Sequence, residues 1–303
     1  NGHTDVNQSL CLGGITYGVT NLEMTAAYAA IANGGKYIEP TLYTTVLDHN
    51  GNIILDKSSN RKKTILRETT AWLLTDAMRD VVEEGTGKTA RVNGWDVAGK
   101  TGTTTDSMDV WFSGYTGYYT GSVWLGFDNN NKTLSTAEES THTKIWSKIM
   151  TAVHADLEPK EIMEKPENII EVDVCAKSGK LPTPGLCDNH IYTEFFAEGT
   201  EPVTQCDVHV FGLACGTDGV LATEYCPYKV EGAIEILPAE HDLLIPGTLL
   251  GSELTGIPIT SRTCHHTFEY MLENHWGGDP ANGGYGYPED YWSHLFPEIT
   301  TPE

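Results

Sequence analysis

The stretch Asp96-Val-Ala-Gly-Lys-Thr-Gly-Thr-Thr104 forms the first of three consecutive predicted strands. The second is Asp109-Val-Trp-Phe-Ser-Gly-Tyr115, and the third is Gly121-Ser-Val-Trp-Leu-Gly-Phe127. Their β-branched and aromatic residues favour extended backbone, and the connections between them are short. Because short connections join antiparallel neighbours, the sequence predicts an antiparallel meander.

Helical patterns and one hairpin surround this meander. Thr20 and Glu23 form a capping box, and Gly34-Gly35 supplies the left-handed stop of the helix that they begin. Apolar residues at helical spacing predict two further helices. A turn at 49–51 predicts a hairpin. The predicted helices are 21–33, 68–84 and 141–157, and the hairpin strands are 43–48 and 52–56. An antiparallel sheet packed with helices is an α+β fold.

Charge and cysteine content divide the chain in two. Residues 1–160 carry 14 basic and 18 acidic side chains, whereas residues 161–303 carry 5 and 24. Such an acidic half repels nucleic acid and anionic membrane surfaces. We therefore predict a unit at 1–158 and an irregular, cysteine-containing extension at 159–303, with a loop-rich tail at 274–303.

Six of the seven cysteines lie in the acidic half, where two variants of one stretch run from Cys175 to Cys187 and from Cys215 to Cys226. Clustered cysteines in loop-rich sequence are typical of disulfides formed outside the cytoplasm. The repeat predicts the pairs Cys175–Cys187 and Cys215–Cys226, which leaves Cys206 for Cys264. A tetrahedral zinc site is the alternative for the last pair, with ligands from Cys206, His209, Cys264, His265 and His266. Cys11 is expected to be a small buried apolar residue.

Lys100-Thr101-Gly102 is the motif that carries chemistry. On an edge strand, Lys100 and Gly102 point to one face while Thr101 and Thr103 point to the other. The missing side chain at Gly102 lets a substrate backbone approach, and the threonine hydroxyls can bind a carboxylate. Lys-Thr-Gly is one of three signatures of penicillin-recognising serine enzymes, beside Ser-x-x-Lys and a Ser-x-Asn type triad.

The order and spacing of four segments resemble the end of a penicillin-binding transpeptidase domain, and the resemblance covers residues 5–155. Beyond it, Ser178-Gly-Lys-Leu181, Phe196-Ala-Glu-Gly-Thr-Glu-Pro202 and Cys206-x-x-His209 resemble the segment that follows this domain in class A penicillin-binding proteins. The four segments are 85–90, 98–104, 109–116 and 123–129. The resemblance implies part of the fold shared by penicillin-binding enzymes and serine β-lactamases.

The resemblance also implies roles for single residues. Lys100 would bind the substrate carboxylate and tune local protonation, and the backbone N–H of Thr103 would be an oxyanion-hole donor. The substrate would lie along Thr101, Gly102, Thr103 and Thr104, and the wall of the site would be braced by Gly85, Thr86 and Gly87. No cofactor and no metal are expected.

The nucleophilic serine is the point of departure from the family pattern. Ser59-Asn-Arg-Lys62 fits Ser-x-x-Lys and Ser58-Ser59-Asn60 fits Ser-x-Asn, but the two motifs overlap in a polar loop. One serine cannot serve both roles. We expect the nucleophile to lie upstream of Asn1. The stretch Gly85-Thr-Gly-Lys-Thr89 is not a phosphate-binding loop, because Val82 occupies the position of its first glycine.

The resemblance implies a peptidoglycan D,D-transpeptidase whose partners are stem peptides, β-lactams and an N-terminal part of the same protein. It would act at the extracytoplasmic face of the bacterial membrane, held there only by an anchor upstream of Asn1. A D,D-carboxypeptidase or β-lactamase of the same fold, or a non-catalytic extracellular wall-binding module, are the alternatives.

Overall fold

The computed structural model describes residues 10, 12–15, 18–57, 62–129, 132–135, 140–217, 221–235, 264–267 and 270. The chain forms two compact units, of which the first comprises Asn1–Ile170 with Phe195–Thr200 and the second comprises Glu171–Glu194 with Glu201–Glu303. The division therefore falls at Ile170, whereas the change in composition suggested Glu158. Among the described residues, no helix has the length and apolar composition needed to cross a bilayer.

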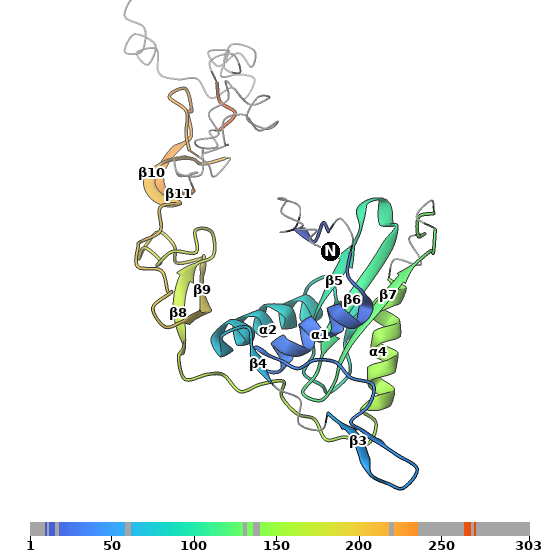
Figure 1. Cartoon of the computed structure of the whole chain (residues 1–303). Helices are drawn as coiled ribbons and strands as arrows, with labels where there is room; N and C mark the ends of the chain where they lie inside the picture. Colours follow the sequence, from blue (N-terminus) through green and yellow to red (C-terminus); the bar gives the residue numbers. More distant parts are fainter. Residues whose placement is uncertain are drawn as a thin grey trace, which may run out of the picture. The chain divides into compact units, whose positions relative to one another are not determined.

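The first unit is built on the predicted meander (Figure 1). Strands β5 (Ala98–Thr103), β6 (Asp109–Tyr115) and β7 (Thr120–Gly126) are antiparallel and adjacent in that order. Lys100 lies opposite Ser113 and Thr103 lies opposite Val110. Because β6 is the central strand, the Lys-Thr-Gly sequence lies on an edge strand of this sheet, as the sequence predicts.

Helices α1 (Asn21–Ala32), α2 (Glu68–Glu83) and α4 (Thr141–Val153) surround the sheet. The capping box of Thr20 and Glu23 is present at the start of α1, which confirms the prediction. Helix α4 ends four residues earlier than predicted. The buried ring of His154 caps it and bonds through Nε2 to the Thr116 hydroxyl at 2.8 Å, where the chain turns away.

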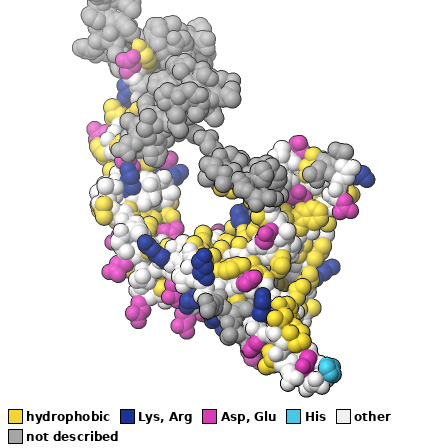
Figure 2. Space-filling model, in the orientation of Figure 1, with side chains coloured by type: hydrophobic (Ala, Val, Ile, Leu, Met, Phe, Trp, Pro, Cys, Tyr) yellow, Lys and Arg dark blue, Asp and Glu magenta, His cyan; other side chains and the backbone are white. Residues whose placement is uncertain are grey.

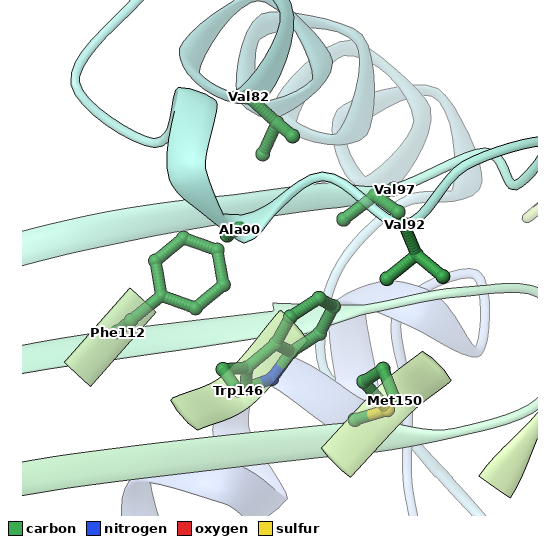
Figure 3. Packing of buried hydrophobic residues seen from close by; sticks show 7 residues of the cluster. All are labelled: Val82, Ala90, Val92, Val97, Phe112, Trp146 and Met150. Atoms are coloured by element: carbon green, nitrogen blue, oxygen red, sulfur yellow. The ribbon is translucent and has the colours of Figure 1, made fainter. Parts of the chain in front are cut away.

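The main core lies between α4 and one face of the sheet (Figure 3). Phe112 of β6 meets Trp146 of α4 edge to face, with ring centroids 5.1 Å apart. The indole N–H of Trp146 donates to the Gly121 carbonyl at 2.9 Å, so this buried donor is satisfied. The remaining members of the cluster are Val82, Ala90, Val92, Val97 and Met150.

A second core cluster lies on the opposite face of the sheet. Tyr115 is three residues from Phe112 on β6 and so points to the other side. It packs with Met78 and Ala98, and with Tyr28 and Ile31 of α1. The sheet is therefore covered by α4 on one face and α1 on the other, which is the α+β layering that the sequence predicts.

Two short antiparallel pairs complete the first unit. Strand β1 (Lys36–Tyr37) pairs with β4 (Lys63–Thr64), and β2 (Thr45–Leu47) pairs with β3 (Ile53–Asp56) in the predicted hairpin. Figure 2 shows hydrophobic side chains along this hairpin, where Ile53 and Ile54 are 62% and 60% exposed. Gly51 adopts a φ of 85° in its turn, a conformation that favours glycine.

Four seven-residue strands follow, so the prediction of an irregular extension is wrong. Strand β8 (Ile169–Cys175) pairs with β9 (Ile191–Ala197), and β10 (His209–Cys215) pairs with β11 (Lys229–Glu235). The alternation of Ile169-Ile-Glu-Val-Asp-Val-Cys175 supports an extended strand, but the glycines, prolines and cysteines around it mask this local signal.

Candidate functional site

Within the described part of the chain, the outer edge of strand β5 is open, because β6 is its only paired neighbour there. The N–H of Thr104 donates to the Asp109 carbonyl at 3.1 Å, which pairs Thr104 with β6. Residues of an antiparallel strand alternate between those bonded to the neighbour and those whose backbone groups point away. The N–H groups of Thr103 and Thr101 therefore point away from β6. The Lys100 ammonium donates to the Thr101 carbonyl at 3.0 Å on this outer side.

The loop after α2 brings a third hydroxyl to this edge. Thr86 Oγ1 lies 2.6 Å from Thr101 Oγ1 in a hydrogen bond between two side chains 15 residues apart. A Cβ at Gly85 would lie 2.8 Å from Val81 Cα, and one at Gly87 would lie 3.0 Å from the Val81 carbonyl oxygen. The two glycines therefore let the loop fold back on α2, which places Thr86 beside the strand.

The exposed ammonium of Lys100 lies close to two oxygen atoms of Thr101. Its Nζ is 3.4 Å from Thr101 Oγ1 and 3.0 Å from the Thr101 carbonyl. The arrangement therefore concentrates positive charge and hydroxyl donors at the open edge. An anionic carboxylate is the kind of ligand that such a group can bind.

The hydroxyl of Thr104 is bonded to the first residue of β6. It donates to the Asp109 carbonyl at 3.2 Å and accepts from the Asp109 N–H at 3.0 Å, so it fastens the turn from β5 to β6. In that turn, Asp106 and Ser107 have φ values of 58° and 52°, which non-glycine residues rarely adopt. The turn at the end of the motif strand is therefore held in a strained conformation.

Three of the predictions made from the sequence concern residues outside the described part of the chain. They concern the Ser59 loop, Cys11 and the tail from residue 274. The remaining candidate residues, from Gly85 to Gly87 and from Lys100 to Thr104, lie together around the end of β5.

The cysteines of the second unit form two four-residue clusters, each with a histidine. In the first, the Nδ1 atom of His209 lies 3.3 Å from Cys175 Sγ, 3.4 Å from Cys187 Sγ and 3.4 Å from Cys206 Sγ. In the second, the Nδ1 atom of His266 lies 3.5 Å from Cys215 Sγ and 3.7 Å from Cys226 Sγ, and Cys264 completes the group. All eight residues are buried.

The structure corrects the predicted disulfide pairing. None of the six described cysteines forms a disulfide, and Cys206 and Cys264 belong to different clusters. The Sγ atoms of Cys175 and Cys206 are 3.6 Å apart, well beyond the ~2.05 Å of a sulfur–sulfur bond. The sequence repeat extends further than the segments that predicted the pairing, since each repeat contributes its own third cysteine and a histidine. The mixed zinc site of Cys206, His209 and Cys264 is likewise not formed.

Burial raises the pKa values of Cys175, Cys187 and Cys226, whereas nearby backbone N–H donors lower them. Burial raises the pKa of Cys187 to about 11 and that of Cys226 to about 12. Burial also raises the pKa of Cys175, but the backbone N–H groups of Ser178 and Lys177 and the Ser178 hydroxyl favour its thiolate, so its pKa is about 6.

Comparison with known proteins bears on both units. Residues 1–151 match the penicillin binding protein transpeptidase domain, and residues 165–211 match the penicillin-binding protein 1A C-terminal domain. The fold of penicillin-binding protein 1A from Haemophilus influenzae is similar, with a TM-score of 0.52, 22% identity, and coverage of 62% of this chain and 33% of that one. The motif strand, its sheet and these matches define a penicillin-binding transpeptidase domain.

The chain belongs to the class A penicillin-binding protein family. It is 37% identical over 232 residues to penicillin-binding protein 1A of Clostridium botulinum, covering 75% of this chain and 28% of that protein. It is 32% identical over 221 residues to penicillin-binding protein 1A/1B of Bacillus subtilis, covering 66% and 24%. The chain thus spans about a quarter of the length of these relatives.

Proposed function

We propose that the protein containing this chain is a serine-type peptidoglycan D,D-transpeptidase, and that the open edge of β5 binds the C-terminal carboxylate of its donor peptide. The observation that carries this proposal is the outward-facing backbone of Thr101 and Thr103 beside the ammonium of Lys100. A peptide that lies along this edge finds strand-like backbone partners and a cation for its carboxylate.

The proposed reaction has two acyl-transfer steps. A serine hydroxyl, supplied by a segment of the same protein outside this chain, attacks the carbonyl carbon between the last two D-alanyl residues of a stem peptide. The amide bond breaks, a serine ester forms, and the leaving amine takes a proton and departs as D-alanine. An amine of a second stem peptide then attacks the ester, which forms the cross-link and returns the hydroxyl to the serine.

The residues of β5 would contribute binding and charge stabilisation to these steps. The Thr103 N–H is a candidate donor to the oxyanion that develops at the attacked carbonyl, since it points away from β6. The hydroxyls of Thr101 and Thr103 would bind the carboxylate together with Lys100. A β-lactam carries a similar carboxylate beside a reactive amide, so it would acylate the same serine.

The test uses the full-length protein and the variant Thr103→Val. Valine keeps the branched shape and the backbone N–H but removes the hydroxyl, so we expect acylation by a fluorescent penicillin to slow roughly 10- to 100-fold. The matched control is Thr105→Val, two residues further on in the turn. Its second-order acylation rate should stay within about twofold of the parent, because ordinary surface changes have small effects.

Three results would contradict the proposal. The first is a Thr103→Val protein that acylates at the parent rate, and the second is equal losses in both variants. The third is a full-length parent that binds no penicillin, which would favour a wall-binding module without catalysis. A D,D-carboxypeptidase would release D-alanine without forming cross-links, so product analysis separates it from the transpeptidase.

A further inference from the structure

The two cysteine–histidine clusters have the geometry of closed metal sites. A tetrahedral zinc ion with Zn–S near 2.3 Å and Zn–N near 2.05 Å separates sulfur from nitrogen by about 3.6 Å and two sulfurs by about 3.8 Å. In the first cluster the sulfur–nitrogen distances are 3.3, 3.4 and 3.4 Å, and the distance between two sulfurs is 3.6 Å. In the second, two sulfur–nitrogen distances are 3.5 and 3.7 Å.

The clusters repeat one another in backbone as well as in side chains. The N–H of Cys206 donates to the Leu181 carbonyl at 2.7 Å, and the N–H of Cys264 donates to the Leu221 carbonyl at 2.9 Å. Each third cysteine is thereby held against the strand-like segment between the first two. The same hydrogen bond occurs in both repeats, so both repeats use the same backbone arrangement to place four side chains around a common centre.

Disulfides do not account for this arrangement. Each cluster holds three buried cysteines and a buried histidine, so one internal disulfide would use two of the four groups and leave the third thiol and the imidazole outside the bond. A metal ion uses all four groups at once. Buried cysteines also make up most of the apolar clusters of this unit, and modules this small usually need disulfides or a metal to fold.

Groups outside the first cluster support its histidine as a ligand. Because Nδ1 of His209 faces the three sulfurs, its Nε2 faces outward, where it lies 3.7 Å from Glu235 Oε1. Glu235 is the residue directly opposite His209 in the β10–β11 pair. A carboxylate behind a metal-bound imidazole is a common arrangement that orients the ring. This Nε2 atom is buried and has no hydrogen bond within the described part of the chain.

We propose that the chain binds two zinc ions, one held by Cys175, Cys187, Cys206 and His209, the other by Cys215, Cys226, Cys264 and His266. Both sites are closed, since four protein ligands fill a tetrahedral zinc, so the ions are structural. His209 and Cys215 are the two ends of β10. Their six intervening steps along a strand separate the sites by about 20 Å, so each ion is mononuclear.

The first experiment measures zinc in the purified 303-residue chain by elemental analysis. We expect two zinc ions per chain. Cys206→Ser and Cys264→Ser should each bind one ion, and the double variant should bind none. The adjacent pair His266→Ala and His265→Ala is the matched control, because His266 faces two sulfurs while His265 is exposed. His266→Ala should lose one ion, and His265→Ala should keep both.

The second experiment uses the unaltered chain, so a variant that fails to fold cannot decide the outcome. Replacement of zinc by Co²⁺ should give thiolate charge-transfer bands and the strong visible bands of tetrahedral cobalt, which saturate at two ions per chain. Absence of bound zinc with the six cysteines in disulfides, measured by mass spectrometry after alkylation, would overturn the proposal. Stoichiometric iron in place of zinc, or equal zinc loss in the two histidine variants, would also overturn it.

Discussion

A hydrogen bond between two threonine hydroxyls joins the loop after α2 to the candidate active-site strand. Thr86 and Thr101 are 2.6 Å apart, and Lys100 reaches the same Thr101 hydroxyl at 3.4 Å. Thr86 therefore acts on the site as a positioning residue through Thr101. We expect Thr86→Val in the full-length protein to slow penicillin acylation by about two- to tenfold, the value of one hydrogen bond.

Making Thr86→Val in a Thr101→Val protein separates this positioning role from an effect on the stability of the fold. In a Thr101→Val protein the partner hydroxyl is already absent, so adding Thr86→Val should change the acylation rate no further. Thr86→Ser, which retains a hydroxyl, should acylate near the parent rate. Rate losses that multiply in the double variant would show that Thr86 acts independently of Thr101.

The buried phenol of Tyr115 should make the stability of the core depend on pH in the alkaline range. Burial raises its pKa to about 12, and the hydrogen bond with the Thr75 hydroxyl at 2.8 Å acts in the opposite direction. The folded protein therefore holds this proton between pH 10 and 12 while the unfolded chain releases it, so stability falls as pH rises through this window. Tyr115→Phe should reduce that alkaline loss by roughly 2 kcal/mol, measured by denaturant unfolding at pH 9 and pH 11.5. Equal losses in both proteins would contradict the assignment.

Sequence reasoning found the motif residues but not all of their partners. Lys100 and Thr103 follow from the tripeptide and from strand alternation alone. The Thr86–Thr101 bond and the use of Thr104 to fasten a turn depend on how the loop after α2 folds back. No local pattern encodes such contacts, since they join residues set by tertiary packing.

Two glycines of β5 differ in how closely neighbouring atoms of the sheet pack against them. A Cβ at Gly99 would lie 2.6 Å from Phe112 Cζ and 2.8 Å from the Ser113 carbonyl oxygen, whereas at Gly102 the nearest atom is Trp111 Cβ at 3.4 Å. Gly99→Ala should lower the free energy of unfolding by about 1–3 kcal/mol because β5 or Phe112 must move.

Gly102→Ala is the matched control for this substitution. Its effect on the melting temperature should be small, while penicillin acylation should fall, because the added methyl group narrows the edge that a substrate approaches. Equal destabilisation by both substitutions would mean that strand propensity rather than packing at Phe112 sets the cost.

The regular elements of the first unit were largely predictable, whereas those of the second were not. A capping box, helical spacing and a turn glycine mark α1, α2 and the β2–β3 hairpin. Among the four strands that follow α4, β9, β10 and β11 each come after a cysteine-bearing loop, and only β8 has a clear alternation. The hairpins there close around cysteine and histidine clusters, whose geometry no short window of sequence contains.

At the scale of the whole chain, the repeat explains why the sequence analysis paired the wrong cysteines. The similar stretches from Cys175 to Cys187 and from Cys215 to Cys226 predicted two pairs, which left Cys206 and Cys264 as partners of each other. The structure shows that each belongs to its own repeat. The spacing to the third cysteine differs greatly between the repeats, so the equivalence becomes visible only in the fold.

The two units should respond differently to removal of metal, a prediction that rests on the proposed zinc sites. The buried clusters of the second unit are formed mainly by cysteines, whereas the first unit has a core of carbon side chains around Phe112 and Trp146. A strong chelator should therefore expose the amides of β10 and β11 to hydrogen exchange and leave those of β6 protected. Hydrogen exchange with mass spectrometry, before and after chelation and after zinc is restored, makes the measurement. Loss of protection in β6 to the same extent, or unchanged protection in β10 after zinc has left, would show that metal does not hold the second unit together.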